Sequence, residues 1–211
     1  DLIHDWRFFA RSNQIAPEGA WQTWLVLAGR GFGKTRTGAE WVREQVKVGR
    51  GRVALIAPTA SDARDVMVEG ESGLLSVCWA GDRAINGDML GRPSYEPSKR
   101  RVTWANGAVA TLFSAEEPER LRGPQHDAGW CDELAAWKYL RETWDMFSFG
   151  LRLGNDPRTV ITTTPKPLPL VREIAKDEKT IVTRGTTFDK AGNLAPKFLQ
   201  TIKEKYEGTR L

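Results

Sequence analysis

The stretch of this sequence best suited to chemistry is a glycine-rich segment that ends in a lysine and a threonine. It runs from Trp24 to Thr37 and reads WLVLAGRGFGKTRT. Glycines allow consecutive backbone N–H groups to point inward at an anion, and a following helix adds its positive N-terminal end. The segment therefore predicts a loop that cradles the phosphates of a nucleotide. Lys34 would reach the β and γ phosphates, and the Thr35 hydroxyl would bind Mg²⁺.

The segment fits the phosphate-binding pattern G-x-x-x-x-G-K-[ST] except at its first position, which is Ala28. Alanine tolerates the turn there if its φ stays negative. The dinucleotide-binding pattern G-x-G-x-x-G fits less well, because from Gly29 it would need a glycine where Lys34 stands. The alternative without chemistry is a glycine-rich turn that merely precedes a lysine.

A second candidate element lies downstream, where a short apolar run ends in two acids. Residues 127–131 read DAGWC, which is typical of a small strand, and Asp132 and Glu133 follow. Asp132 would hold Mg²⁺ through water, and Glu133 could accept a proton from an attacking water or orient it. An isolated Asp-Glu pair is more often an acidic cluster at a helix N-terminus, but together with a phosphate-binding loop it predicts nucleotide hydrolysis.

Two further polar groups are predicted near the nucleotide. The amide of Gln14 could read the N6/N7 edge of adenine, or Gln14 is simply a loop glutamine in solvent. Thr162, Thr163 and Thr164 end a β-branched run and would lie at the same sheet edge as Asp132, where they could sense the γ-phosphate. The ordinary preference of threonine for strands explains much of this run.

The hydrophobic pattern predicts strands and helices in alternation. This order favours an α/β fold with right-handed crossovers and a mostly parallel central sheet flanked by helices, with a β-hairpin insertion at Asn106-Gly107 and a small C-terminal helical segment. Residues 70–97 show no clear signal. The expected strands are 24–28, 53–57, 102–104, 109–113, 127–131, 158–164 and 180–184, and the expected helices are 1–11, one that follows the loop and ends near 49, 60–69, 134–147, 168–175 and 195–206.

The composition is that of an ordinary globular protein with one well-cored domain. The 211 residues are 40% hydrophobic and 27% charged, and the net charge of +4 permits an anionic partner without requiring one. Two cysteines give no disulfide framework, which favours a reducing compartment. No apolar run is long enough to span a membrane, so we expect no membrane partner. We expect the main domain over 1–188 and a linker or lid segment over 189–211.

Taken together, Gln14 with Pro17, AGRGFGKTRTGAEW, LRGPQHDAGWCDE and TTTP resemble the N-terminal ATPase domain of the large terminase subunit of tailed double-stranded DNA bacteriophages. In that family the domain is a P-loop NTPase of the additional-strand, glutamate-using type, and it powers the packaging of DNA into a procapsid. The resemblance implies hydrolysis of ATP with Mg²⁺ as cofactor. It implies that Glu133, Lys34, Arg122 and Arg30 are catalytic, that Thr35 and Asp132 hold the metal, that Thr162, Thr163 and Thr164 couple hydrolysis to movement, and that Gln14, Ala28, Gly29, Arg30, Gly31, Phe32, Gly33, Lys34, Thr35 and Arg36 bind the nucleotide.

Two of these roles come from the resemblance alone. Arg30 matches a position at which terminases carry an arginine that senses the nucleotide. Arg122 matches an arginine that related motors supply to the ATP of a neighbouring subunit, and such an arginine finger is worth about 10³ to 10⁵ in rate. The alternative for Arg122 is a salt bridge to Glu116, Glu117 or Glu119.

The partners that the resemblance implies are double-stranded DNA, the portal protein, the small terminase subunit and further copies of the chain, in a ring expected to be a pentamer. The location would be the cytoplasm of a bacterial host, at the procapsid portal. The family's nuclease domain carries an acidic metal cluster that nothing after residue 190 supplies, so we expect no DNA cleavage. Two alternatives stay open: a helicase-type nucleic-acid-dependent ATPase, and a scaffold module that binds nucleotide without hydrolysing it.

Overall fold

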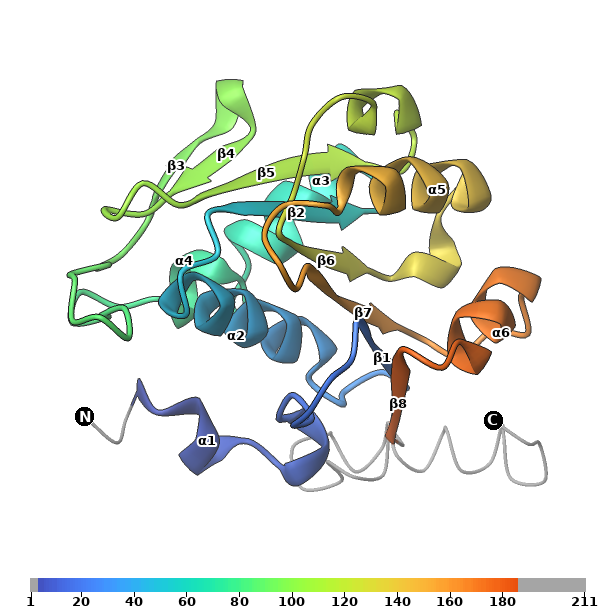
Figure 1. The fold of residues 1–211 in the computed structure, drawn as a ribbon, viewed down its shortest axis with the longest axis horizontal. Helices are drawn as coiled ribbons and strands as arrows, with labels where there is room; N and C mark the ends of the chain where they lie inside the picture. Colours follow the sequence, from blue (N-terminus) through green and yellow to red (C-terminus); the bar gives the residue numbers. More distant parts are fainter. Residues whose placement is uncertain (1–3, 186–211) are drawn as a thin grey trace, which may run out of the picture.

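The computed structural model describes residues 4–185, and they form one eight-stranded sheet with helices on both faces (Figure 1). The strand order is β3-β4-β5-β2-β6-β7-β1-β8. Neighbours from β5 to β8 pair in parallel, whereas β3–β4 and β4–β5 are antiparallel. The strands are β1 (Thr23–Ala28), β2 (Arg52–Ala57), β3 (Ser94–Glu96), β4 (Arg101–Thr103), β5 (Val109–Ser114), β6 (Ala128–Asp132), β7 (Arg158–Thr163) and β8 (Thr180–Gly185).

The position of β7 confirms the predicted fold class. This strand lies between β1, which leads into the glycine-rich loop, and β6, which ends at Asp132. An extra strand between these two is the feature that gives the additional-strand class its name. Because all three strands are parallel, their carboxyl ends meet at one edge of the sheet, where α/β folds bind ligands.

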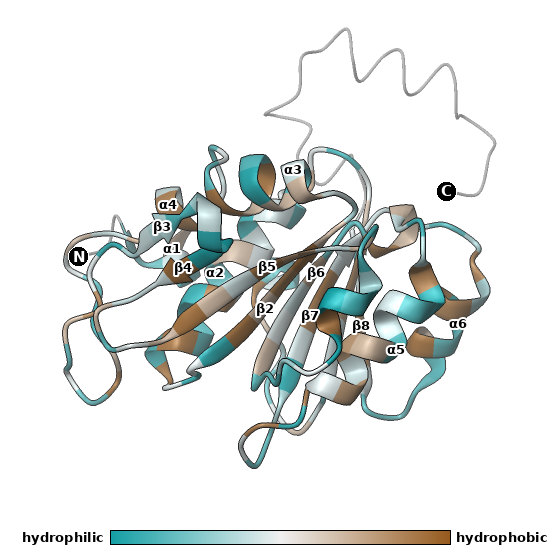
Figure 2. Cartoon of the chain, turned by 90° about the horizontal axis from the view of Figure 1, so that it is seen from above, coloured by the Kyte–Doolittle hydropathy of each residue, from teal (hydrophilic) through white to brown (hydrophobic). Residues whose placement is uncertain are grey.

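Two layers of helices cover the sheet, and Figure 2 shows them on its two sides with apolar strands between them. On one face α2, the η3 turn and α4 enclose a core that includes Trp24, Trp130 and Met67. On the other face α5 and α6 enclose Phe147 and Ile161. The helical segments are α1 (Trp6–Phe9), η2 (Ser12–Gln14), α2 (Lys34–Lys47), α3 (Ala60–Asp62), η3 (Ala63–Val68), α4 (Leu74–Val77), η4 (Pro97–Lys99), η5 (Pro118–Leu121), η6 (Leu134–Ala136), α5 (Leu140–Gly150) and α6 (Pro169–Lys176).

Three predicted helices are shorter or less regular than expected. The helix expected over 1–11 is only α1. The helix expected over 60–69 continues from α3 into a π-helical turn, which brings Ala63, Met67 and Val68 all into the core. The helix expected over 134–147 starts six residues late, at Leu140, because the chain turns at Glu133 and the indole of Trp137 donates to the carbonyl of Asp132. The expected helix 195–206 and the linker 189–194 lie outside the described residues.

The predicted hairpin is confirmed: β4 and β5 pair antiparallel around Gly107, whose φ is 84°. Residues 70–97, where the sequence pattern is unclear, contain α4 and β3. They are anchored from outside their own stretch, since Asp82 pairs with Arg43 of α2. Within residues 4–185, no helix has the length and apolar character that crossing a membrane would require.

Candidate functional site

The glycine-rich loop connects the end of β1 to the start of α2. Gly31 and Gly33 have φ of 79° and 88°, in the left-handed region that favours glycine. Ala28 is still part of β1 and its φ is not positive, so an alanine fits there as the sequence predicts. A loop with two left-handed glycines before a helix has the backbone form of an anion-binding nest.

Lys34, the first residue of α2, places its ammonium group at the centre of the site. Its Nζ donates to the carbonyls of Ala28 (3.0 Å) and Gly29 (3.2 Å) and to Thr164 Oγ1 (3.3 Å), and it lies 3.2 Å from Glu133 Oε1. The side chain is only 8% exposed. A buried cation with these partners is well placed to accept a phosphate oxygen as an additional anionic partner.

Asp132 ends β6 next to Thr162 of β7, and both side chains are buried. The Thr162 hydroxyl donates to Asp132 Oδ1 at 2.7 Å. Burial raises the pKa of Asp132 to about 7, although the Thr162 hydrogen bond and the Lys34 charge act in the opposite direction. The carboxylate is therefore an anion that a cation would stabilise, and a bound divalent ion favours the ionised form strongly.

Glu133 adopts a backbone conformation that is uncommon for a residue with a side chain. Its φ and ψ are both 45°, which is left-handed. This turn directs the carboxylate toward Thr164, whose backbone N–H (3.2 Å) and Oγ1 (3.2 Å) donate to Oε2. Non-glycine residues with positive φ cost free energy and cluster at functional sites. The turn thus sets Glu133 beside Lys34 rather than continuing the strand.

The residues at this sheet edge fit a nucleotide with Mg²⁺. They comprise a backbone nest, a buried ammonium, a buried carboxylate and a second, 35% exposed carboxylate. Among the described residues no group of three or more His, Cys, Asp and Glu could hold a metal alone. Mg²⁺ held by Thr35 and Asp132 would thus need phosphate and water oxygens as its other ligands, which is how Mg²⁺ is commonly bound.

Gln14 lies against the loop, and its amide is already engaged there. Nε2 donates to the Phe32 carbonyl (3.1 Å), and Oε1 accepts from the Arg11 N–H (3.2 Å). Arg11 also donates to the Phe32 carbonyl (2.5 Å) and lies over the Phe32 ring, 4.7 Å from its centroid. Both side chains therefore support the loop from behind, and a role of Gln14 in reading adenine stays a prediction.

The three predicted arginines lie in different surroundings. Arg30 is exposed at the tip of the loop. Arg36 points along α2 and pairs with Glu40 at 2.6 Å. Arg122 follows η5 and pairs with Glu119 at 3.1 Å, one of the alternatives considered, but its side chain is 66% exposed. An exposed ion pair holds a side chain weakly, so this contact leaves Arg122 available to a partner.

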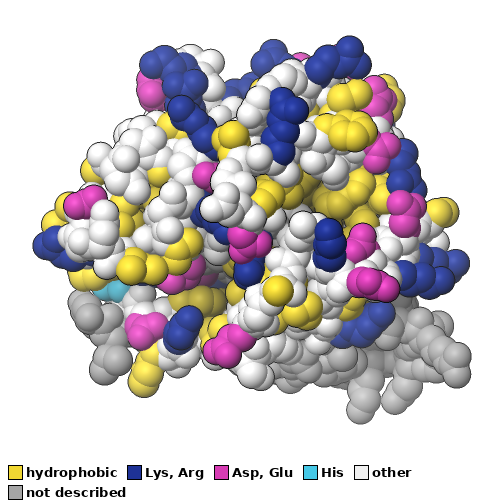
Figure 3. Space-filling view, viewed as in Figure 1, with side chains coloured by type: hydrophobic (Ala, Val, Ile, Leu, Met, Phe, Trp, Pro, Cys, Tyr) yellow, Lys and Arg dark blue, Asp and Glu magenta, His cyan; other side chains and the backbone are white. Residues whose placement is uncertain are grey.

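Figure 3 shows Lys and Arg side chains along the upper edge of the molecule, over the β3–β4 turn and η5. Acidic partners accompany most of them. Lys99 pairs with Glu96 (2.6 Å), and Glu117 accepts from Arg100 (2.8 Å). The basic run at 99–101 is thus largely neutralised by its neighbours.

The family model described as "Terminase large subunit, T4likevirus-type, N-terminal" matches residues 25–211, a range that includes the glycine-rich loop, Asp132, Glu133 and the threonine run. The chain belongs to this family. It is thereby confirmed as the N-terminal ATPase domain of a large terminase subunit. The curated proteins contain no match to it.

Solved terminase structures share the fold at low sequence identity. The ATPase domain of the Thermus phage P74-26 large terminase has a TM-score of 0.65 at 15% identity, over 94% of this chain and 91% of that chain. The full-length large terminase of a thermophilic bacteriophage, in complex with ADP, has a TM-score of 0.66 at 13% identity, over 90% of this chain and 46% of that one. The same bacteriophage protein with ATP-gamma-S has a TM-score of 0.58 at 10% identity, over 98% and 48%. The terminase chain thus spans about half the length of this bacteriophage protein.

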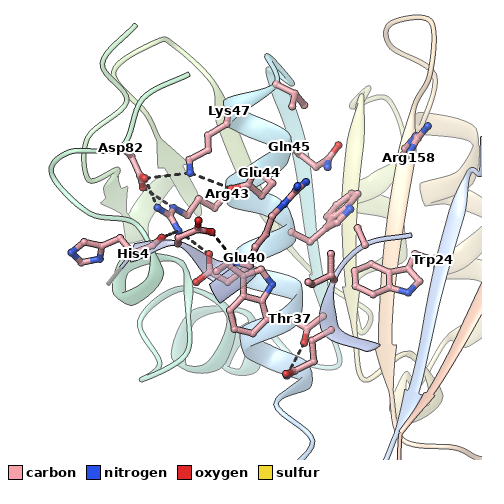
Figure 4. Close-up of a pocket in the computed structure, with 18 of the residues that line it drawn as sticks. His4, Trp24, Thr37, Glu40, Arg43, Glu44, Gln45, Lys47, Asp82 and Arg158 are labelled. Atoms are coloured by element: carbon pink, nitrogen blue, oxygen red, sulfur yellow. Dashed lines mark hydrogen bonds and ion pairs between the residues drawn. The ribbon is translucent and has the colours of Figure 1, made fainter. Parts of the chain in front are cut away.

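A cavity of about 550 Å³ lies along α2 of the terminase domain, away from Lys34 and Glu133. It separates the N-terminal segment from α2, and of the loop's neighbours it touches Gln14 and Thr37. Figure 4 shows Arg43 and Lys47 pointing toward Asp82 at the opposite end from Thr37. This end is closed by buried ion pairs, so the cavity is a feature separate from the predicted catalytic groups.

Sequence reasoning missed three residues that contact the site from behind. Arg11 supports the loop, Trp130 donates to Thr162, and Gly185 lies directly against the Phe32 ring. The position of Trp130 two residues before Asp132 was the one available signal, because alternate residues of a strand share a face. Nothing local marks Arg11 or Gly185.

Proposed function

We propose that this domain hydrolyses ATP to drive double-stranded viral DNA into a procapsid. The observation that carries the proposal is the convergence of Lys34 and Glu133, 3.2 Å apart, beside the buried carboxylate of Asp132. These groups come from two sheet strands separated by a third, so only the folded sheet brings them together. Family membership and the nucleotides named in the structures of the bacteriophage relative support the same conclusion.

Each residue has a role in the proposed reaction that follows from its chemistry. The loop N–H groups and Lys34 would bind the phosphates and orient the γ-phosphate. Mg²⁺, held by Thr35 and Asp132, would neutralise charge on the β and γ phosphates. Glu133 would accept the proton of the attacking water, and Thr164, which contacts both Glu133 and Lys34, would relay the change of partners to the chain after β7.

Arg122 would act on the nucleotide of a neighbouring copy. Its exposure and its distance in sequence from the loop suit a group that reaches outward. A finger in trans makes the specific activity depend on protein concentration, because the site is complete only in an assembly. Portal protein, small terminase subunit and a ring of copies are the partners that such a motor would need.

The test compares the terminase chain with Glu133→Gln, and uses Glu178→Gln, a surface glutamate, as the matched control. We expect Glu133→Gln to bind ATP but to lose turnover, whereas Glu178→Gln keeps both. Rates measured against protein concentration, with and without double-stranded DNA, should rise steeply for the native chain. Unchanged turnover in Glu133→Gln would remove Glu133 from the mechanism, and nucleotide binding with no turnover at any concentration would favour the scaffold alternative.

A further inference from the structure

Trp130 donates a hydrogen bond to the residue that holds the predicted metal ligand. Its indole lies on β6, two residues before Asp132, and is fully buried. Nε1 is 2.8 Å from Thr162 Oγ1, and Thr162 Oγ1 is 2.7 Å from Asp132 Oδ1. The three side chains therefore form a buried series of hydrogen bonds that crosses from β6 to β7 and returns.

Elementary chemistry fixes the direction of this series. An indole N–H can only donate, so the Thr162 oxygen must accept from Trp130. A hydroxyl has a single hydrogen, and that hydrogen then points to Asp132 Oδ1, 2.7 Å away. Consecutive hydrogen bonds polarise one another, so the indole also strengthens the bond to the carboxylate. Without the N–H, the hydroxyl would lose the contact that fixes its rotation.

The position of the indole is fixed by the helix that carries Lys34. Gly38 of α2 lies flat against the Trp130 ring, and a Cβ built on Gly38 would overlap the ring at Nε1 and its two neighbouring carbons. The indole is therefore confined between α2 and β7 with its N–H directed at Thr162. This contact connects the phosphate-binding helix to the Asp132 carboxylate without passing through the nucleotide.

We propose that Trp130 is a positioning residue for Mg²⁺ at the nucleotide: it holds Thr162 as a donor to Asp132 Oδ1 and so fixes the orientation of the metal-binding carboxylate. The inference rests on the proposed function, since it assumes that Asp132 binds Mg²⁺. Partners of metal ligands typically contribute 10- to 100-fold to metal affinity. We expect a loss of about 10-fold without the indole N–H and of up to about 100-fold without the Thr162 hydroxyl.

The experiment replaces Trp130 by 3-benzothienylalanine, which has the shape of tryptophan with sulfur in place of N–H. Thr162→Val and Thr162→Ser remove and restore the hydroxyl. Trp24 provides the matched control, because its buried indole donates to Thr183 Oγ1 at 2.9 Å in the adjoining strands, away from Asp132. The readout is the affinity for a fluorescent ADP analogue with Mg²⁺ and with EDTA.

The ratio of the two affinities reports Mg²⁺ binding apart from turnover. We expect this ratio to fall in the Trp130 variant and in Thr162→Val, to recover in Thr162→Ser, and to stay native when Trp24 carries the same replacement. A native ratio in the Trp130 variant would overturn the inference alone, as would an equal fall in the Trp24 variant. A native chain whose ADP affinity does not respond to Mg²⁺ would overturn the proposed function as well.

Discussion

A methyl group on Gly185 should disturb the phosphate-binding loop. Gly185 ends β8 opposite Ala28, where the loop leaves β1, and a Cβ there would lie within 3.0 Å of three carbons of the buried Phe32 ring. Carbon atoms normally approach to about 3.5–4.0 Å, so the ring must move in Gly185→Ala. Overpacking of this kind costs about 1–3 kcal/mol. If the loop absorbs all of the strain, nucleotide affinity falls by about 5- to 150-fold.

The assay combines urea denaturation with nucleotide titration for Gly185→Ala, Phe32→Leu and the double variant. Gly51→Ala is the matched control, because a Cβ there meets nothing closer than 4.0 Å. Shortening Phe32 makes room for the new methyl group, so the double variant should be more stable than the sum of the single changes by about 0.5–3 kcal/mol. The reasoning fails if Gly185→Ala behaves like Gly51→Ala, or if the two single changes simply add.

Two further predictions concern buried charges. Burial lowers the pKa of His126 to about 4, so the folded state binds fewer protons than the unfolded state between about pH 6.5 and 4, and stability from this residue is lost as the pH falls through that range, by about 3 kcal/mol in total. The raised pKa of Asp132 has the opposite sign, so urea unfolding of the native chain minus His126→Leu isolates the slope, and parallel pH curves would contradict this assignment. Asp82→Ala should destabilise the domain by about 3–5 kcal/mol, because Arg43, 3% exposed, loses its two-pronged partner, whereas Asp156→Ala at a half-exposed pair should change little; equal urea midpoints would show that Arg43 finds other partners.

Local patterns predicted the parts of the fold that depend on local patterns. The apolar run before Ala28, the left-handed glycines and the helix after Lys34 follow from residues within one short segment, and the structure confirms them. The same holds for the hairpin at Gly107. The helix expected from 134 failed because Glu133 turns left-handed, and helical periodicity does not reveal that single backbone angle.

The site could be predicted in its membership but not in its support. Lys34, Asp132 and Glu133 carry recognisable chemistry at recognisable places. Contacts between distant segments have no such signal: the pair Arg43–Asp82 joins residues 39 apart, and Phe32 meets Gly185 across the width of the sequence. Such contacts follow from the strand order, which the sequence does not state.

The left-handed turn at Glu133 has a consequence for how the domain can be stabilised. Glycine adopts φ of 45° without steric penalty, whereas a side chain there costs about 1 kcal/mol or more. Selection for thermal robustness alone would therefore favour Glu133→Gly, a protein that melts later and turns over nothing. The glutamate persists only under a requirement other than folding, so heat-selected libraries that lose this residue would reveal where the chain trades endurance for work.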